Sequence, residues 1–195
     1  MNFLAKKITL FFIRRKQIEQ SDYETFVYCF EILLSSVFNT VILLICALVS
    51  RFYLETAVFA IALIISRKMF GGFHAKTHFG CMSMLIFSYC VFAVLLYFVD
   101  VHSLGILSVV FCSLFILPVI CLAPVSHPNN PLSANNIKKG KIFSALTMLL
   151  CFTVSILAHI YGFQKIGFLI AFPVACSAVA MLVGKLCYAH VHFRQ

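Results

Sequence analysis

The sequence predicts an all-α, polytopic membrane protein with about six transmembrane helices and an N-terminal amphipathic helix at the membrane interface. Of its 195 residues, 63% are hydrophobic and only 11% are charged, whereas ordinary globular domains carry about 25% charged residues. A soluble chain of this size cannot hide so many apolar side chains from water, and its 22 Phe exclude a disordered chain. The whole chain, 1–195, is therefore expected to form a single integral membrane domain.

The first expected element is a basic amphipathic helix within residues 1–23, suited to an anionic membrane surface. The apolar face of this helix consists of Leu4, Ile8, Phe11 and Phe12. Its basic residues are Lys6, Lys7, Arg14, Arg15 and Lys16. Six apolar runs follow, and each is expected to span the membrane: 24–50, 52–66, 82–99, 103–123, 142–160 and 166–187. The second run is short, so we expect it to tilt, to extend into the next loop or to thin the bilayer.

The basic residues predict the orientation of these spans. With a cytoplasmic N-terminus, segments 1–23, 67–81, 124–141 and the C-terminal tail are cytoplasmic. They carry thirteen of the fifteen Lys and Arg residues, and the outer loops carry only Arg51 and Lys165. This bias is typical of the cytoplasmic side of membrane proteins. It places both termini in the cytoplasm and accounts for the net charge of +9, so nucleic-acid binding is not expected.

The loop 67–81 is the first candidate site, because it combines a Gly pair, two His, a Cys and three basic residues. If Cys81 opens the third span, the helix N-terminus favours its thiolate, and a neutral histidine within reach, His74 or His78, could act as general base. His74 and Cys81 would lie about 10 Å apart along one straight helix. The pair therefore requires a break between them, which Gly80 offers.

Neither Asp nor Glu lies in this loop to orient the histidine. A backbone carbonyl, Ser83 or a group from another span could do so. Glu31 is one such group, because an ionisable residue inside a span is a functional candidate; it could also hold Arg67 or make an ordinary polar contact between helices. A metal held by His74, His78 and Cys81 is a rival interpretation, but no fourth ligand is near and the basic residues repel a cation. No metal or cofactor is predicted.

The loop 124–141 is the second candidate site. It contains Pro124, Pro128 and Pro131, which stiffen an irregular connection, followed by Lys138, Lys139 and Lys141. These lysines are expected either to contact lipid headgroups or to bind an acidic segment of a substrate.

The run R-x4-G-x-H-A-x5-C, formed by Arg67, Gly72, His74, Ala75 and Cys81, resembles the signature of the accessory gene regulator B family. Its members are bacterial membrane cysteine endopeptidases that process quorum-sensing peptide precursors. Residues 27–40 also resemble the first span of the family, and residues 123–132 resemble its second loop. The resemblance extends to about residue 141, and the His–Cys motif is its most specific part.

This resemblance implies that Cys81 cleaves a short precursor and holds its N-terminal fragment as a thioester, which then closes into a thiolactone or lactone ring. It selects His74 over His78 as the base, and it matches Arg67 and Gly72 to positions associated with activity. It further implies a precursor with an amphipathic N-terminal part and an acidic C-terminal part, the latter bound by basic residues (Arg67, Lys76, Lys138, Lys139 and Lys141). A homodimer in the bacterial cell membrane is expected, with the site at the cytoplasmic face. The alternative is a transporter or peptide exporter, for which Cys81 would be dispensable.

Overall fold

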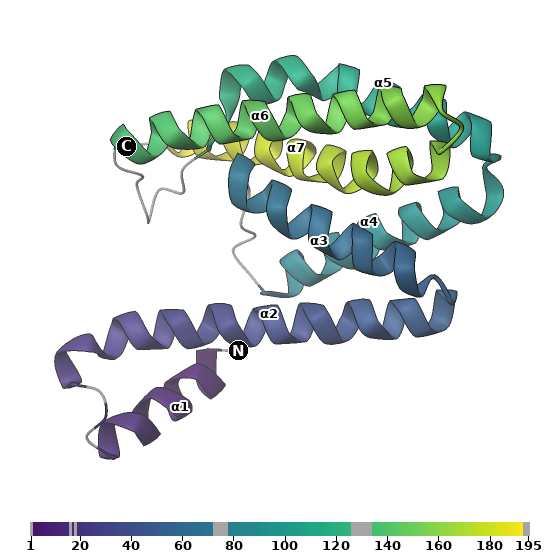
Figure 1. Cartoon of the computed structure of the whole chain (residues 1–195). Helices are drawn as coiled ribbons and strands as arrows, with labels where there is room; N and C mark the ends of the chain where they lie inside the picture. Colours follow the sequence, from purple (N-terminus) through teal and green to yellow (C-terminus); the bar gives the residue numbers. More distant parts are fainter. Residues whose placement is uncertain (1, 16, 18, 72–77, 126–133, 193–195) are drawn as a thin grey trace. The chain divides into compact units, whose positions relative to one another are not determined.

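The computed structural model describes residues 2–15, 17, 19–71, 78–125 and 134–192. Within them the chain forms α-helices and one short 3₁₀ turn, as Figure 1 shows. The elements are α1 (Asn2–Arg14), the turn Gln20–Asp22, α2 (Tyr23–Ser50), α3 (Tyr53–Phe70), α4 (His78–Phe98), α5 (Val101–Leu122), α6 (Ala134–Ile160) and α7 (Gln164–His192). The prediction of an all-α protein is confirmed.

Five of the described helices are long and apolar enough to cross a membrane. They fall in Gln20–Ser50, Gly80–Phe98, Val101–Leu122, Ile137–Ile160 and Gln164–Leu186. The remaining predicted span is α3, which has 18 residues and includes Glu55, Arg67 and Lys68 near its ends. The prediction of a multi-pass membrane protein with about six spans is therefore confirmed.

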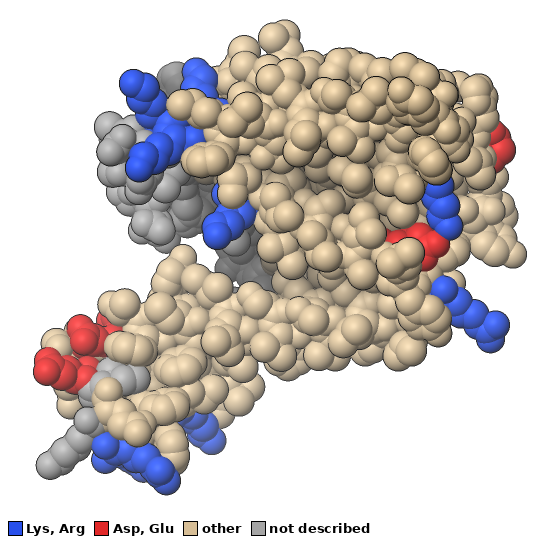
Figure 2. Space-filling view, viewed as in Figure 1, with Lys and Arg blue, Asp and Glu red and all other residues tan. Residues whose placement is uncertain are grey.

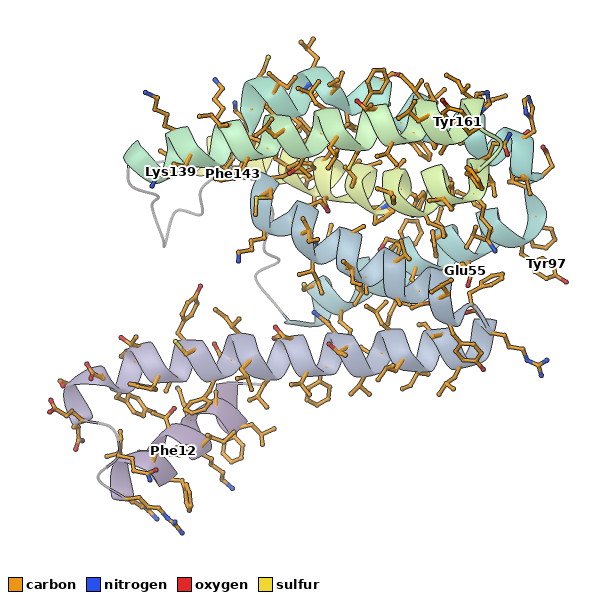
Figure 3. The ribbon with its side chains drawn as sticks, viewed as in Figure 1. Phe12, Glu55, Tyr97, Lys139, Phe143 and Tyr161 are labelled. Atoms are coloured by element: carbon orange, nitrogen blue, oxygen red, sulfur yellow. The ribbon has the colours of Figure 1, made fainter. Side chains whose placement is uncertain are left out.

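The chain divides into two compact units, which we describe separately. The small unit comprises Met1–Val49 and Ala75–Phe87. In it, the predicted amphipathic segment is the helix α1, and the Phe12 ring stacks on Phe30 of α2 with 5.7 Å between ring centroids. Figure 3 labels Phe12 between these two helices. The basic residues Lys6 and Lys7 of α1 are exposed.

The second unit, called the bundle from here on, comprises Ser50–His74 and Ser88–Gln195. Its central helix is α7, which packs against α3, α5 and α6. Small residues permit this packing: a Cβ atom added at Gly167 of α7 would lie 3.2 Å from the Ala158 side chain and 3.2 Å from the Ser108 hydroxyl. Because lipid is as apolar as a helix surface, membrane helices associate through close packing of this kind.

Aromatic rings join the C-terminal half of α4 to the bundle. Phe92 of α4 is fully buried, and its ring lies 4.8 Å from Phe59 of α3 and 5.9 Å from Phe168 of α7, measured between centroids. The Tyr89 hydroxyl hydrogen-bonds to Ser50 and Thr56, at 2.8 and 2.6 Å. This polar group is thereby satisfied inside the apolar bundle, as burial requires.

The two ends of the bundle differ in charge. The basic end is formed by the end of α3 and the start of α6. These two segments carry Arg67, Lys68, Lys138, Lys139 and Lys141, and their sequences contain no Asp or Glu. At the opposite end, Lys165 donates a hydrogen bond of 2.6 Å to Glu55, and Asp100 caps α5. Figure 2 shows blue side chains gathered where α6 begins, and Figure 3 labels Lys139 at this end and Glu55, Tyr97 and Tyr161 at the other.

Candidate active site

Cys81 lies in the first turn of α4, which begins at His78. The structure corrects the prediction that Cys81 opens this helix and that Gly80 forms a break before it, because both residues are helical. The reason is local: a glycine is tolerated within the first turn, where few intrahelical hydrogen bonds depend on it. Cys81 is half-buried. Its position in the first turn of α4 places it near the positive end of the helix dipole.

Several predicted site residues lie outside the described residues. These are His74, Gly72 and Lys76, together with the side chain of His78. The helices on either side are described: α3 ends at Phe70 and α4 begins at His78. The predicted pairing of His74 with Cys81 therefore lies outside the described residues.

Two other candidates, Glu31 and Ser83, belong to the small unit, as Cys81 does. Glu31 lies in α2 and is half-buried, and Ser83 lies in α4, two residues after Cys81, and is exposed. Arg67 belongs instead to the bundle, in the last turn of α3. It is half-buried, and its charge acts on Cys176 of α7.

The three lysines of the second loop lie on a helix. They were predicted to lie in the loop 124–141 (Lys138, Lys139 and Lys141), whereas α6 already begins at Ala134. Lysine has a good helix propensity, so a boundary drawn from hydropathy alone falls too late. All three are exposed on the first two turns of α6, where they can contact an acidic peptide or anionic lipid.

The structure also shows a link between the two candidate loops that the sequence analysis missed. Gly71, directly after α3, forms a parallel β-bridge with Val125, and the Val125 N–H donates a 3.0 Å hydrogen bond to the Phe70 carbonyl. Gly71 of the first candidate loop and Val125 of the second are therefore joined within the bundle. The Gly pair at 71 and 72 was the available signal, but the resemblance drew attention to Gly72 rather than Gly71.

A metal site is not found among the described residues, in which no three His, Cys, Asp or Glu side chains cluster. Of the three ligands considered for the rival metal site, only Cys81 has a described side chain. The described residues therefore offer cysteine chemistry at the start of α4 and a basic surface at one end of the bundle.

Comparison with known protein families decides which class of protein this is. The family model for accessory gene regulator B matches residues 5–182. The chain belongs to the accessory gene regulator B family. Neither a curated protein nor a solved structure matches it.

Members of the accessory gene regulator B family act in the quorum-sensing system of that name and are known for peptide processing. The matched range extends from α1 into α7 and includes every candidate residue of both loops. The resemblance noted in the sequence is thereby confirmed over nearly the whole chain, and the apolar helices agree with a multi-pass membrane protein of this family.

Proposed function

We propose that this protein is a membrane-embedded cysteine endopeptidase, in which Cys81 is the nucleophile and His74 is the general base. The observation that carries the proposal is the position of Cys81, half-buried in the first turn of α4, within the range that the family model matches. A helix N-terminus lowers the free energy of a thiolate relative to a thiol. The thiolate, rather than the thiol, is the nucleophile in cysteine chemistry.

The proposed reaction proceeds through an acyl-enzyme. His74 takes the thiol proton of Cys81, and the sulfur attacks a peptide carbonyl of the precursor. The C–N bond then breaks, His74 returns the proton to the leaving amine, and the N-terminal fragment stays on Cys81 as a thioester. A Cys or Ser side chain within the fragment next attacks the thioester, which closes a thiolactone or lactone ring and releases the Cys81 thiol. The thioester retains enough acyl energy for this step to need no cofactor.

The proposed substrate is a short precursor with an amphipathic N-terminal part and an acidic C-terminal part. The basic end of the bundle supports this proposal. It carries the exposed lysines at the start of α6 and Arg67 at the end of α3, and no Asp or Glu lies next to them in the sequence. Lys76 is proposed to contribute to the same surface. Such a surface attracts an acidic peptide over about a Debye length. Anionic lipid headgroups are the competing ligand.

The same charge distribution supports the proposed orientation. Basic residues concentrate on the cytoplasmic side of membrane proteins, so we assign the basic end of the bundle, both termini and the active site to the cytoplasmic face of the bacterial membrane. Glu31 and Ser83 are proposed as supporting groups of the site, and Gly72 as a residue that permits the turn before His74. A homodimer is proposed on the ground of family membership.

The experiment that tests the proposed function is co-expression with the precursor encoded beside the gene. Cys81→Ser is compared with Cys90→Ser, which changes an exposed cysteine of the same helix α4. We expect precursor cleavage in the unaltered protein and in Cys90→Ser, and none in Cys81→Ser. Cleavage at an unchanged rate in Cys81→Ser would exclude the proposal. If every variant cleaves the precursor but the peptide product no longer appears in the medium, the result would indicate a transporter.

A further inference from the structure

Three exposed tyrosines gather at the end of the bundle that lies opposite its basic end. Tyr53 begins α3, Tyr97 lies in the last turn of α4, and Tyr161 lies in the turn between α6 and α7. They are 59%, 75% and 71% exposed, in that order. Figure 3 labels Tyr97 and Tyr161 at this end, together with Glu55. The three tyrosines are called the tyrosine belt.

Contacts between helices of the bundle place the tyrosine belt at one level. The 2.6 Å hydrogen bond from Lys165 to Glu55 joins the start of α7 to the start of α3. A Cβ atom at Gly105 would lie 2.5 Å from the His159 ring and 2.5 Å from the Gln164 side chain, so the start of α5 lies against the end of α6 and the start of α7. Two residues connect α4 to α5. The helix ends that carry the three tyrosines therefore meet at this end of the bundle.

The two parts of a tyrosine side chain favour different surroundings in a membrane. In hydrocarbon the hydroxyl group would lack a hydrogen-bond partner, which costs free energy, and in bulk water the apolar ring would be hydrated. The boundary between lipid tails and headgroups satisfies both parts, and tyrosine is enriched there. Tyr89 is the contrasting case, because it is buried and its hydroxyl hydrogen-bonds to Ser50 and Thr56.

The length of α6 fits a tyrosine belt at the edge of the hydrocarbon core. Residues 142–160 contain no Lys, Arg, Asp or Glu, and they lie between Lys141, at the basic end, and Tyr161. At about 1.5 Å per residue, this stretch rises about 29 Å, and the hydrocarbon core of a bilayer is about 30 Å thick. Lys141 and Tyr161 can therefore lie at the two edges of the core at the same time.

We propose that the tyrosine belt binds the interfacial layer of the bilayer leaflet opposite the basic end, and so fixes the depth of the bundle in the membrane. The partner is the glycerol-ester and headgroup region of phospholipids. The tyrosine hydroxyls donate hydrogen bonds to its oxygen atoms, and the rings pack against the upper part of the acyl chains. This role depends on the geometry of the membrane and not on peptide chemistry, so it stands independently of the proposed function.

The test uses the fluorescence of a single introduced tryptophan, because the sequence contains no Trp. Tyr161→Trp and Tyr97→Trp are compared with Leu150→Trp, which changes an exposed residue near the middle of α6. Leu150 and Tyr161 differ in height by about 16 Å along the helix. Each full-length protein is reconstituted into vesicles of phosphatidylcholine whose acyl chains carry bromine either near the carbonyl end or near the methyl end.

We expect opposite depth profiles for the belt positions and the control. Bromine near the carbonyl end should quench Tyr161→Trp and Tyr97→Trp more strongly, and bromine near the methyl end should quench Leu150→Trp more strongly. The emission of Leu150→Trp should also shift to a shorter wavelength, because its surroundings are drier. Circular dichroism checks that each variant keeps its helices, and Tyr53→Trp replaces a variant that does not fold.

Three results would each overturn the proposal. Stronger quenching of the belt variants by bromine near the methyl end would place this end of the bundle inside the hydrocarbon core. Quenching by dissolved iodide, without quenching by either lipid, would place the belt in water. Protection from iodide and from both lipids would mean that protein, such as a second copy of this chain, covers the tyrosines instead of lipid.

Discussion

Replacement of Phe92 by alanine is expected to destabilise the bundle strongly. Phe92 is fully buried, and its ring has four aromatic neighbours: Phe59 at 4.8 Å, Phe172 at 5.7 Å, and Tyr89 and Phe168 at 5.9 Å. Phe→Ala in a water-soluble core costs about 3–5 kcal/mol, including the cavity. Lipid is a better solvent for Phe than water is, which lowers the transfer part. The lost ring pairs are worth about 0.5–1.5 kcal/mol each, so we expect a loss of about 2–4 kcal/mol.

The assay is reversible unfolding of the purified protein in mixed micelles of a mild detergent and sodium dodecyl sulfate, followed by circular dichroism. The matched control is Phe98→Ala, on the same helix but 77% exposed, which should change the unfolding free energy by less than about 0.5 kcal/mol. Equal effects of the two substitutions would refute the reasoning, because they would mean that α4 does not pack into the bundle through this aromatic cluster.

Two further predictions concern the end of the bundle that lies opposite its basic end. The Ser103 backbone N–H donates a 2.9 Å hydrogen bond to the Asp100 carboxylate and thereby lowers the pKa of this carboxyl group. The stabilisation by this hydrogen bond is therefore full above the ordinary pKa of Asp, and it is lost as the pH falls through the lowered pKa. Asp100→Ala should therefore decrease the melting temperature at neutral pH, and a difference that persists unchanged in strong acid would contradict this cap. A Cβ atom at Gly105 would lie 2.5 Å from the His159 ring, so Gly105→Ala should destabilise by about 1–3 kcal/mol; an unaltered melting temperature would show that the ring moves aside freely.

Two of the long helices could be predicted closely from hydropathy alone. The apolar run 103–123 matches α5 (Val101–Leu122), and the run 166–187 lies within α7. The start of α6 could not be predicted in this way, because Lys138 and Lys139 lower the hydropathy of its first turns while their helix propensity stays high.

The candidate site could be predicted only in part. Cys81 was identifiable because its surroundings in the sequence, basic residues and histidines between two apolar runs, are unusual for a membrane cysteine. The link between Gly71 and Val125 could not be predicted, because it joins residues more than fifty positions apart and depends on a backbone conformation rather than a residue pattern. The division of α4 between two units, with Cys81 in one and Phe92 in the other, likewise follows from long-range packing.

The most direct test of the proposed function is the intact mass of the protein after co-expression with its precursor. The proposed mechanism predicts an added mass equal to the N-terminal fragment of the precursor. Hydroxylamine should remove the adduct, as expected for a thioester, and Cys81→Ala should not form it, while Cys90→Ala should form it normally. Cleavage that persists in Cys81→Ala, or an adduct located on another cysteine, would contradict the assignment of Cys81 as the nucleophile.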